Sequence, residues 1–123
     1  MTLEGKFDVA LSPQKDEQAP VGRMLIDKTY HGKMKGIGTG QMISKRLENG
    51  TAAYFAIEEF VGKINEKSGS FTLLHNGFMN SDSQSLDIII LEGSGTGELA
   101  TISGKMDITI EDGNHFYKVD YDL

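Results

Sequence analysis

The sequence predicts an all-β fold of about eight antiparallel strands. Apolar and polar residues alternate along most of the chain, which is typical of strands with one buried face and one wetted face. The chain has 15 glycines and only 2 prolines, and glycine inside a strand marks bends and close backbone approach. Short turns join the alternating segments, and short connections between successive strands imply antiparallel pairing.

Four strands are expected in the first half of the chain. Pro13 and Pro20 bracket a polar segment, residues 14–18, which is expected to be a loop. Asn49-Gly50 is a typical turn dipeptide between two alternating segments. The expected strands are residues 3–11, 22–34, 38–47 and 51–64.

Four more strands are expected in the second half. Residues 67–69 and 112–114 are turn sequences, and residues 80–84 form a polar loop. The chain leaves room for helix only in small pieces, such as a single turn at residues 98–100. The expected strands are residues 70–79, 85–91, 103–111 and 115–123.

A chain of 123 residues is the size of one domain, so we expect residues 1–123 to form a single unit. Eight antiparallel strands either close into a barrel or pack as two sheets. Alternation alone does not distinguish these architectures. The internal glycines favour a barrel, because strands that close on themselves must bend sharply.

The composition excludes several kinds of protein. The chain has no cysteine, which excludes disulfides and thiolate metal sites. Its net charge of −6, with no basic stripe, argues against nucleic-acid binding. No segment reaches the roughly 20 apolar residues of a membrane span, and the start does not resemble a signal peptide, so a soluble, cytoplasmic protein is expected. Its three histidines lack metal-site spacing, and we expect no metal or other cofactor.

Six short motifs are spread over nearly the whole chain. They are Gly22–Lys28 with His31-Gly32, Tyr54–Glu58, Ser68–Gly77, Gly95–Leu99, His115–Tyr117 and Tyr121–Leu123. In combination they resemble DUF3224, a family of small bacterial proteins of unknown function. The resemblance implies a single antiparallel eight-stranded barrel of the kind seen in plant allene oxide cyclase. It implies no activity, and no catalytic motif of the cyclase matches this sequence residue by residue.

Ionisable side chains on apolar strand faces are the candidate functional residues. Lys28 and His75 each alternate with apolar neighbours. Glu58 lies in a segment whose two faces are equally apolar. We expect it to point inward, because the resemblance to DUF3224 includes Tyr54 together with Glu58. The predicted ligand-binding residues are Lys28, Tyr54, Glu58, His75, Tyr117 and Tyr121.

These residues support more than one hypothesis. A barrel of this size is either filled by side chains or holds one small ligand, so a small molecule is expected inside the barrel or at its mouth. The alternative is structural, with Lys28 and Glu58 as a satisfied ion pair and His75 hydrogen-bonded to a tyrosine hydroxyl or a backbone carbonyl.

Two further functions stay open. Glu58 and His75 could serve as acid and base in an isomerase- or cyclase-type reaction. The protein could also act through its outer surface as a homo-oligomer, with other subunits covering an exposed apolar patch. The residues expected in that patch are Phe55, Ile57, Val61, Ile89 and Leu91.

Overall fold

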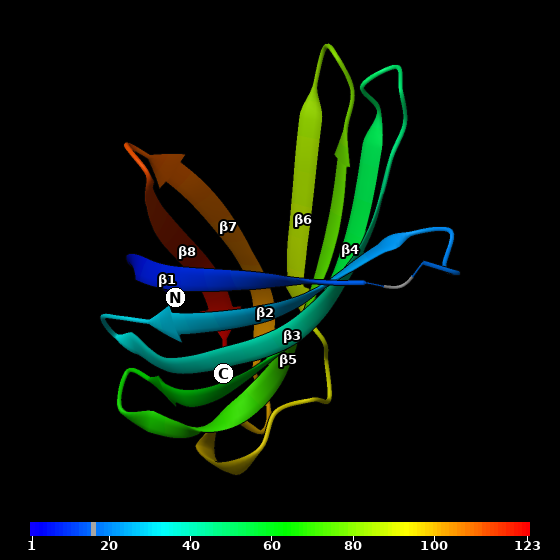
Figure 1. Cartoon of the computed structure of the whole chain (residues 1–123). Coiled ribbons are helices and arrows are strands. Elements are labelled where there is room, and N and C mark those ends of the chain that lie inside the picture. The colour runs from blue at the N-terminus through cyan, green and yellow to red at the C-terminus, as the bar shows by residue number, and fades with distance from the viewer. Residues whose placement is uncertain (16) are drawn as a thin grey trace.

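The chain forms a closed antiparallel barrel of eight strands that pair in sequence order, with β8 returning to β1 (Figure 1). The computed structural model describes residues 1–15 and 17–123. This architecture confirms the predicted fold class. The elements are β1 (Thr2–Gln14), β2 (Gly22–Tyr30), β3 (Met34–Arg46), β4 (Ala52–Ile64), β5 (Lys67–Met79), β6 (Gln84–Ile90), the short 3-10 helix η1 (Gly97–Leu99), β7 (Ser103–Glu111) and β8 (Asn114–Asp122).

The expected strand over residues 22–34 is divided between two strands. β2 ends at Tyr30, and Met34 already begins β3. Gly32 lies between them with φ +104°, a conformation that favours glycine and permits a tight reversal. The alternation continues through this turn, which is why the sequence pattern alone did not reveal it.

β1 is longer than expected, because Gln14 still belongs to the strand and not to the predicted loop over residues 14–18. Asp16 of that loop lies outside the described residues. Pro13 is accommodated inside β1, opposite Met24. A proline cannot donate a ladder hydrogen bond, but β8 pairs only with residues 2–7, so Pro13 lies on a free edge.

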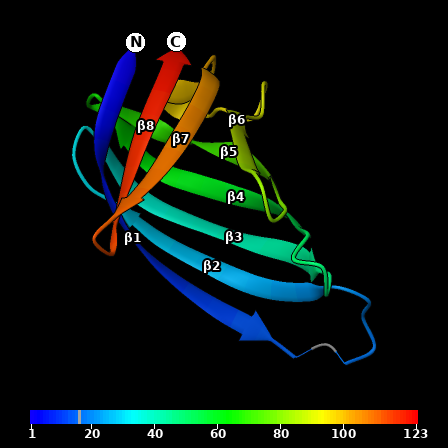
Figure 2. The same ribbon diagram turned by 90° about the horizontal axis from the view of Figure 1, so that it is seen from above.

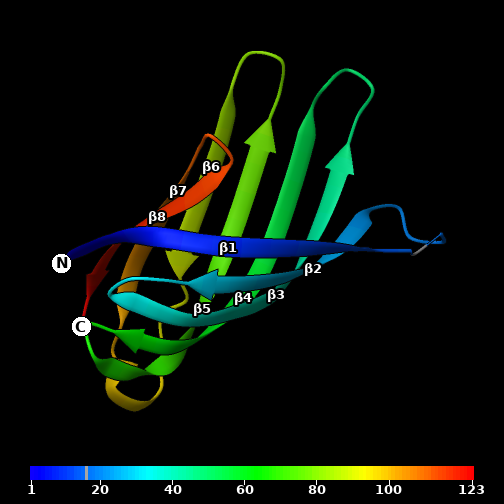
Figure 3. The ribbon, with the colours of Figure 1, turned by 60° about the vertical axis from the view of Figure 1, so that its left-hand side comes forward.

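The barrel is closed at one end and open at the other. The β6–β7 pairing consists of only two residue pairs, Ile88–Met106 and Ile89–Lys105. The β1–β8 pairing stops at Phe7, and beyond it β1 diverges from β8 (Figure 2). The β3–β4 and β5–β6 hairpins extend as a curved sheet beyond the part of the barrel where all eight strands form a closed ring (Figure 3). We call the ring end the closed end and the splayed end the open end.

Burial differs between the two ends. The open end carries inward-facing apolar side chains that are only half buried, including Met24, Met42 and Tyr54. Leu11 and Ile110, also on inward-facing positions, are 51% and 64% exposed. The buried core fills the closed end and consists of Leu3, Phe7, Tyr30, Met34, Phe60, Ile64, Phe71, Leu73, Ile88, Ile90, Leu99, Ile102, Met106, Tyr117, Val119 and Tyr121.

Candidate functional site

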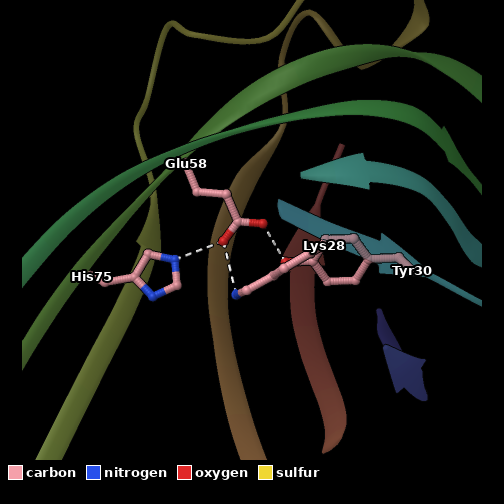
Figure 4. A network of polar contacts seen from close by, with 4 residues as sticks. All are labelled: Lys28, Tyr30, Glu58 and His75. Carbon is pink, nitrogen blue, oxygen red and sulfur yellow. Dashed lines mark hydrogen bonds and ion pairs between the residues drawn. The ribbon is translucent and has the colours of Figure 1, made fainter. Parts of the chain in front are cut away.

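A buried carboxylate, that of Glu58, is the centre of a polar cluster inside the barrel (Figure 4). Lys28 Nζ donates to Glu58 Oε1 at 3.0 Å. His75 Nε2 lies 2.9 Å from the same oxygen, and the Tyr30 hydroxyl donates to Oε2 at 2.5 Å. Both carboxylate oxygens are therefore satisfied by protein groups.

Strand register brings these side chains together from three strands. Lys28 on β2 pairs with Gly38 on β3, and Gly40 pairs with Glu58 on β4. A side chain at Gly38 would place its Cβ 2.1 Å from Glu58 Oε2. Glycine at that position thus leaves the space that the carboxylate occupies. His75 on β5 lies opposite Ala56, one inward position along β4 from Glu58.

The cluster holds Glu58 in its ionised form. Burial alone would raise the pKa of Glu58, and this is the largest single effect. The hydrogen bond from His75, the charge of Lys28 and the hydrogen bond from Tyr30 together outweigh burial and lower the pKa below its ordinary value. Glu58 is therefore a carboxylate at neutral pH.

Tyr30 acts as a neutral hydrogen-bond donor to that carboxylate. Burial, followed by the negative charge of Glu58, raises the pKa of Tyr30 well above its ordinary value. Its ring also packs edge-on against Phe60, with 5.5 Å between the ring centroids. Tyr30 thus links the polar cluster to the closed-end core.

His75 retains one ring nitrogen for another partner. An ionised carboxylate can only accept, so Nε2 carries a proton and donates to Glu58. In neutral His75 the other nitrogen, Nδ1, is then an acceptor. Nδ1 has no hydrogen-bond partner among the described residues. Every fully buried side-chain nitrogen or oxygen of those residues does have a partner, so Nδ1 is not fully buried. Nδ1 consequently keeps some contact with solvent.

The ammonium group of Lys28 is held between its carboxylate partner and aromatic rings. Its Nζ lies 4.9 Å from the centroid of the Phe7 ring and 5.8 Å from that of Tyr30. Such cation–π contacts favour a desolvated cation. The positive charge of Lys28 is therefore stabilised by the Glu58 carboxylate and by the two aromatic rings.

The cluster lies where the filled core ends. Glu58 is fully buried at 0% exposure, whereas Lys28 and His75 keep 6% and 8%. The next inward-facing positions toward the open end include Met42, opposite Ala56, and Tyr54, opposite Gly77. These two are half buried. Lys28, Glu58 and His75 thus form the polar floor of the open end.

The three tyrosines predicted for the ligand site are placed differently. Tyr54 faces the open end, where burial raises its pKa. Tyr117 is buried in the closed end, and its hydroxyl donates to the carbonyl oxygen of His31 at 2.7 Å. Tyr121 is also in the closed-end core and accepts from Asn65 Nδ2 at 3.1 Å. Tyr117 nevertheless touches the cluster, because its ring packs edge-on against Tyr30 with 5.6 Å between the ring centroids. Tyr121 forms its hydrogen bond away from the cluster, with Asn65.

Tyr30 is the member of the cluster that was not predicted as a site residue. The sequence contained a signal for it, since Tyr30 lies two positions after Lys28 and therefore on the same strand face. The inward orientation expected for Glu58 is found. Within residues 1–15 and 17–123, no group of three or more His, Cys, Asp or Glu side chains is arranged to hold a metal ion.

Fold and cluster together define a small β-barrel protein with one packed end, one open end and a buried carboxylate between them. The sequence pattern of DUF3224, described as a protein of unknown function, matches residues 3–121. The chain belongs to the DUF3224 family.

The structural comparison gives the same family. A DUF3224 protein of unknown function from Shewanella oneidensis MR-1, known from a crystal structure, is 38% identical in sequence with a TM-score of 0.93. The alignment covers 100% of this chain and 97% of that chain. No curated protein matches the sequence. In the part of the chain that the structure describes, no helix is long and apolar enough to cross a membrane.

Proposed function

We propose that the protein binds a small, largely apolar molecule in the open end of the barrel. One observation carries this proposal: inward-facing apolar side chains there, such as Met42 and Tyr54, are only half buried. Exposed apolar surface on the concave side of a sheet is stabilised by an apolar guest. The polar floor of Lys28, Glu58 and His75 would orient that guest.

A cavity beside the short β6–β7 seam offers an entry route. It has a volume of about 500 Å³ and is lined in part by Tyr54, Leu86 and Ile108. Volumes of roughly 300–1,000 Å³ are typical of small-molecule sites. Tyr54 lies over Gly77, which is one inward position from His75 on β5. The cavity is therefore close to the polar floor.

The floor favours a neutral ligand that carries a hydrogen-bond donor. The charges of Lys28 and Glu58 cancel in their ion pair, so this pair has no net charge to attract an ion. His75 Nδ1 would accept a hydrogen bond from a hydroxyl or N–H group of the guest. A ligand of the class of a long-chain or cyclic alcohol meets both conditions.

An isomerase- or cyclase-type activity is the second candidate. It is favoured by the 2.9 Å contact between His75 and Glu58, which is the arrangement of a histidine base with its orienting carboxylate. Glu58 is fully buried, so the proton from a substrate would go to His75 Nδ1. Deuterium incorporation into a bound ligand in heavy water would test this activity, with loss in a His75→Gln variant as the expected control.

Binding can be tested with Nile red, a neutral apolar dye, and with 1-decanol as its competitor. We expect the wild-type protein to enhance dye fluorescence, and decanol to reverse the enhancement more effectively than decanoate. A Met42→Lys variant places a charge in the open end and should abolish binding. The matched variant Ile57→Lys places the same charge on the outer face, where Ile57 is 61% exposed, and should bind normally.

Several outcomes would overturn the proposal. Dye binding that survives in Met42→Lys, or that is lost only in Ile57→Lys, would place the apolar site outside the barrel. Decanoate that competes better than decanol would contradict a floor without net charge. Circular dichroism of each variant ensures that a loss of binding is not a loss of fold.

A further inference from the structure

The outer surface of the barrel carries a second, larger concave site. A groove of about 1120 Å³ crosses the outer face of β2 to β6. Its walls are mainly outward-facing residues, and the inward-facing residues that also line it are Ile26, Gly40, Ala56 and His75. The apolar side chains that line it on this face are Leu25, Ile43, Phe55, Ile57, Leu74 and Ile89.

Register places four of these residues in one row across the strands. Leu25 and Ile57 lie on either side of Gln41, and Leu74 and Ile89 continue the row onto β5 and β6. Four inter-strand steps of about 4.8 Å give this row a length of roughly 19 Å. The groove is therefore an elongated apolar strip that runs across the strands.

The charged side chains that line the groove on the outer face are all acidic. Asp27 and Glu59 lie on the neighbouring row, on either side of Thr39, and Asp87 lies on the opposite flank. None of the three has an ion-pair partner in the part of the chain described. No lysine or arginine is among the residues lining the groove.

This charge pattern selects among the occupants of the groove. A second copy docked face to face would bring the same carboxylates together, between two chains that each carry a net charge of −6. A partner with apolar side chains flanked by positive charge would complement both features. An amphipathic helix lies in an apolar groove in this way, with charges on its flanks.

We propose that the outer groove docks a positively charged amphipathic helix of a partner protein. A helix rises about 1.5 Å per residue, so a 19 Å strip matches roughly 13 residues. Apolar side chains on one helical face would cover the row from Leu25 to Ile89. Lysine or arginine beside that face would pair with Asp27, Glu59 and Asp87.

Fluorescence anisotropy with two labelled model helices of about 14 residues tests this proposal. Both present a leucine face, and one carries lysine and the other glutamate on its flanks. We expect the lysine helix alone to bind, and to bind more weakly as salt rises. Combining Asp27→Asn, Glu59→Gln and Asp87→Asn should reduce its affinity at least tenfold.

A matched variant separates the groove from general acidity. Asp107→Asn, Glu111→Gln and Asp112→Asn together remove as many charges elsewhere on the surface, and this variant should bind the lysine helix within about threefold of wild type. Equal losses in the two triple variants would overturn the proposal, as would binding of the glutamate helix or no binding of the lysine helix at low salt. Light scattering would assign the groove to a second copy instead if the wild-type protein is a dimer and the Ile57→Lys variant is a monomer.

Discussion

The closed and open ends of the barrel are built from the same alternating strands but are stabilised differently. At the closed end, aromatic rings such as Phe60 and Phe71 pack in a tilted arrangement with 5.0 Å between their centroids, and they have almost no exposed surface. At the open end, equivalent inward positions hold flexible side chains such as Met24 and Met42, which are half buried. The ring of strands closes only where the interior is filled.

This difference indicates that the two ends contribute unequally to the stability of the fold. The closed-end core supplies most of the folding free energy, because stability scales with the apolar area removed from water. The open end contributes less, because its inward-facing side chains are only partly buried. The Glu58 cluster lies at the boundary between the two ends, where Glu58 is fully buried and Lys28 and His75 keep 6% and 8% exposure.

The largest expected effect is at the closed end. Phe60→Ala would remove a fully buried ring that contacts Tyr30 and Phe71, and should lower the free energy of unfolding by about 4 kcal/mol. Met42→Ala at the open end should cost only about 1 kcal/mol, since that side chain is only partly buried. Urea unfolding followed by circular dichroism measures both. Equal losses would contradict the division between the ends.

The second largest effect is expected for the Glu58 cluster, at the boundary between the two ends. Glu58→Gln would leave the Lys28 ammonium buried without its counter-charge, and we expect a loss of about 3 kcal/mol in unfolding free energy. The neighbouring variant Glu59→Gln changes an exposed side chain and should stay within about 0.5 kcal/mol of wild type. Adding Lys28→Met to Glu58→Gln should recover much of the loss. If it does not, the unpaired ammonium is not the cause.

A third effect tests the space reserved for the carboxylate. Gly38→Ala would bring a methyl group against Glu58 Oε2 and the Tyr30 ring, and should lower the unfolding free energy by about 2 kcal/mol. Gly22→Ala at the open end is the matched control, because its added Cβ would meet Ser44 Oγ at an ordinary 3.4 Å. The control should be neutral. A neutral Gly38→Ala would show that the cluster can shift without penalty.

The fold was predictable from the sequence because it depends on a local property, the two-residue period of the strands. The barrel shape was favoured by glycines such as Gly38, whose role is to admit a large side chain from a neighbouring strand. The turn at Gly32 was missed because the alternation of β2 continues into β3 without a break.

The site was only partly predictable. Lys28, Glu58 and His75 were recognisable as polar residues on apolar faces, and register brings them together. Tyr117 and Tyr121 have the same inward orientation, yet they lie at the closed end. Distance along the barrel axis depends on the stagger between strands, which alternation does not encode. Tyr30, by contrast, lies on the same strand as Lys28, and it was missed although alternation places both on one face.

The smallest effect expected is the response of the boundary to acid. The folded structure lowers the pKa of Glu58 below its ordinary value of 4.5, so in acid the unfolded chain binds a proton at this site more readily than the folded protein does. The stabilisation from the Glu58 carboxylate is therefore complete above about pH 5.5 and is lost as the pH falls through the folded-state pKa. The gap in unfolding free energy between wild type and Glu58→Gln should narrow from pH 5.5 to pH 2.5. Other acidic groups, such as Asp120 at the protein surface, titrate in both proteins and cancel in this difference. A gap that stays constant or widens over this range would mean that the cluster does not favour the ionised form of Glu58.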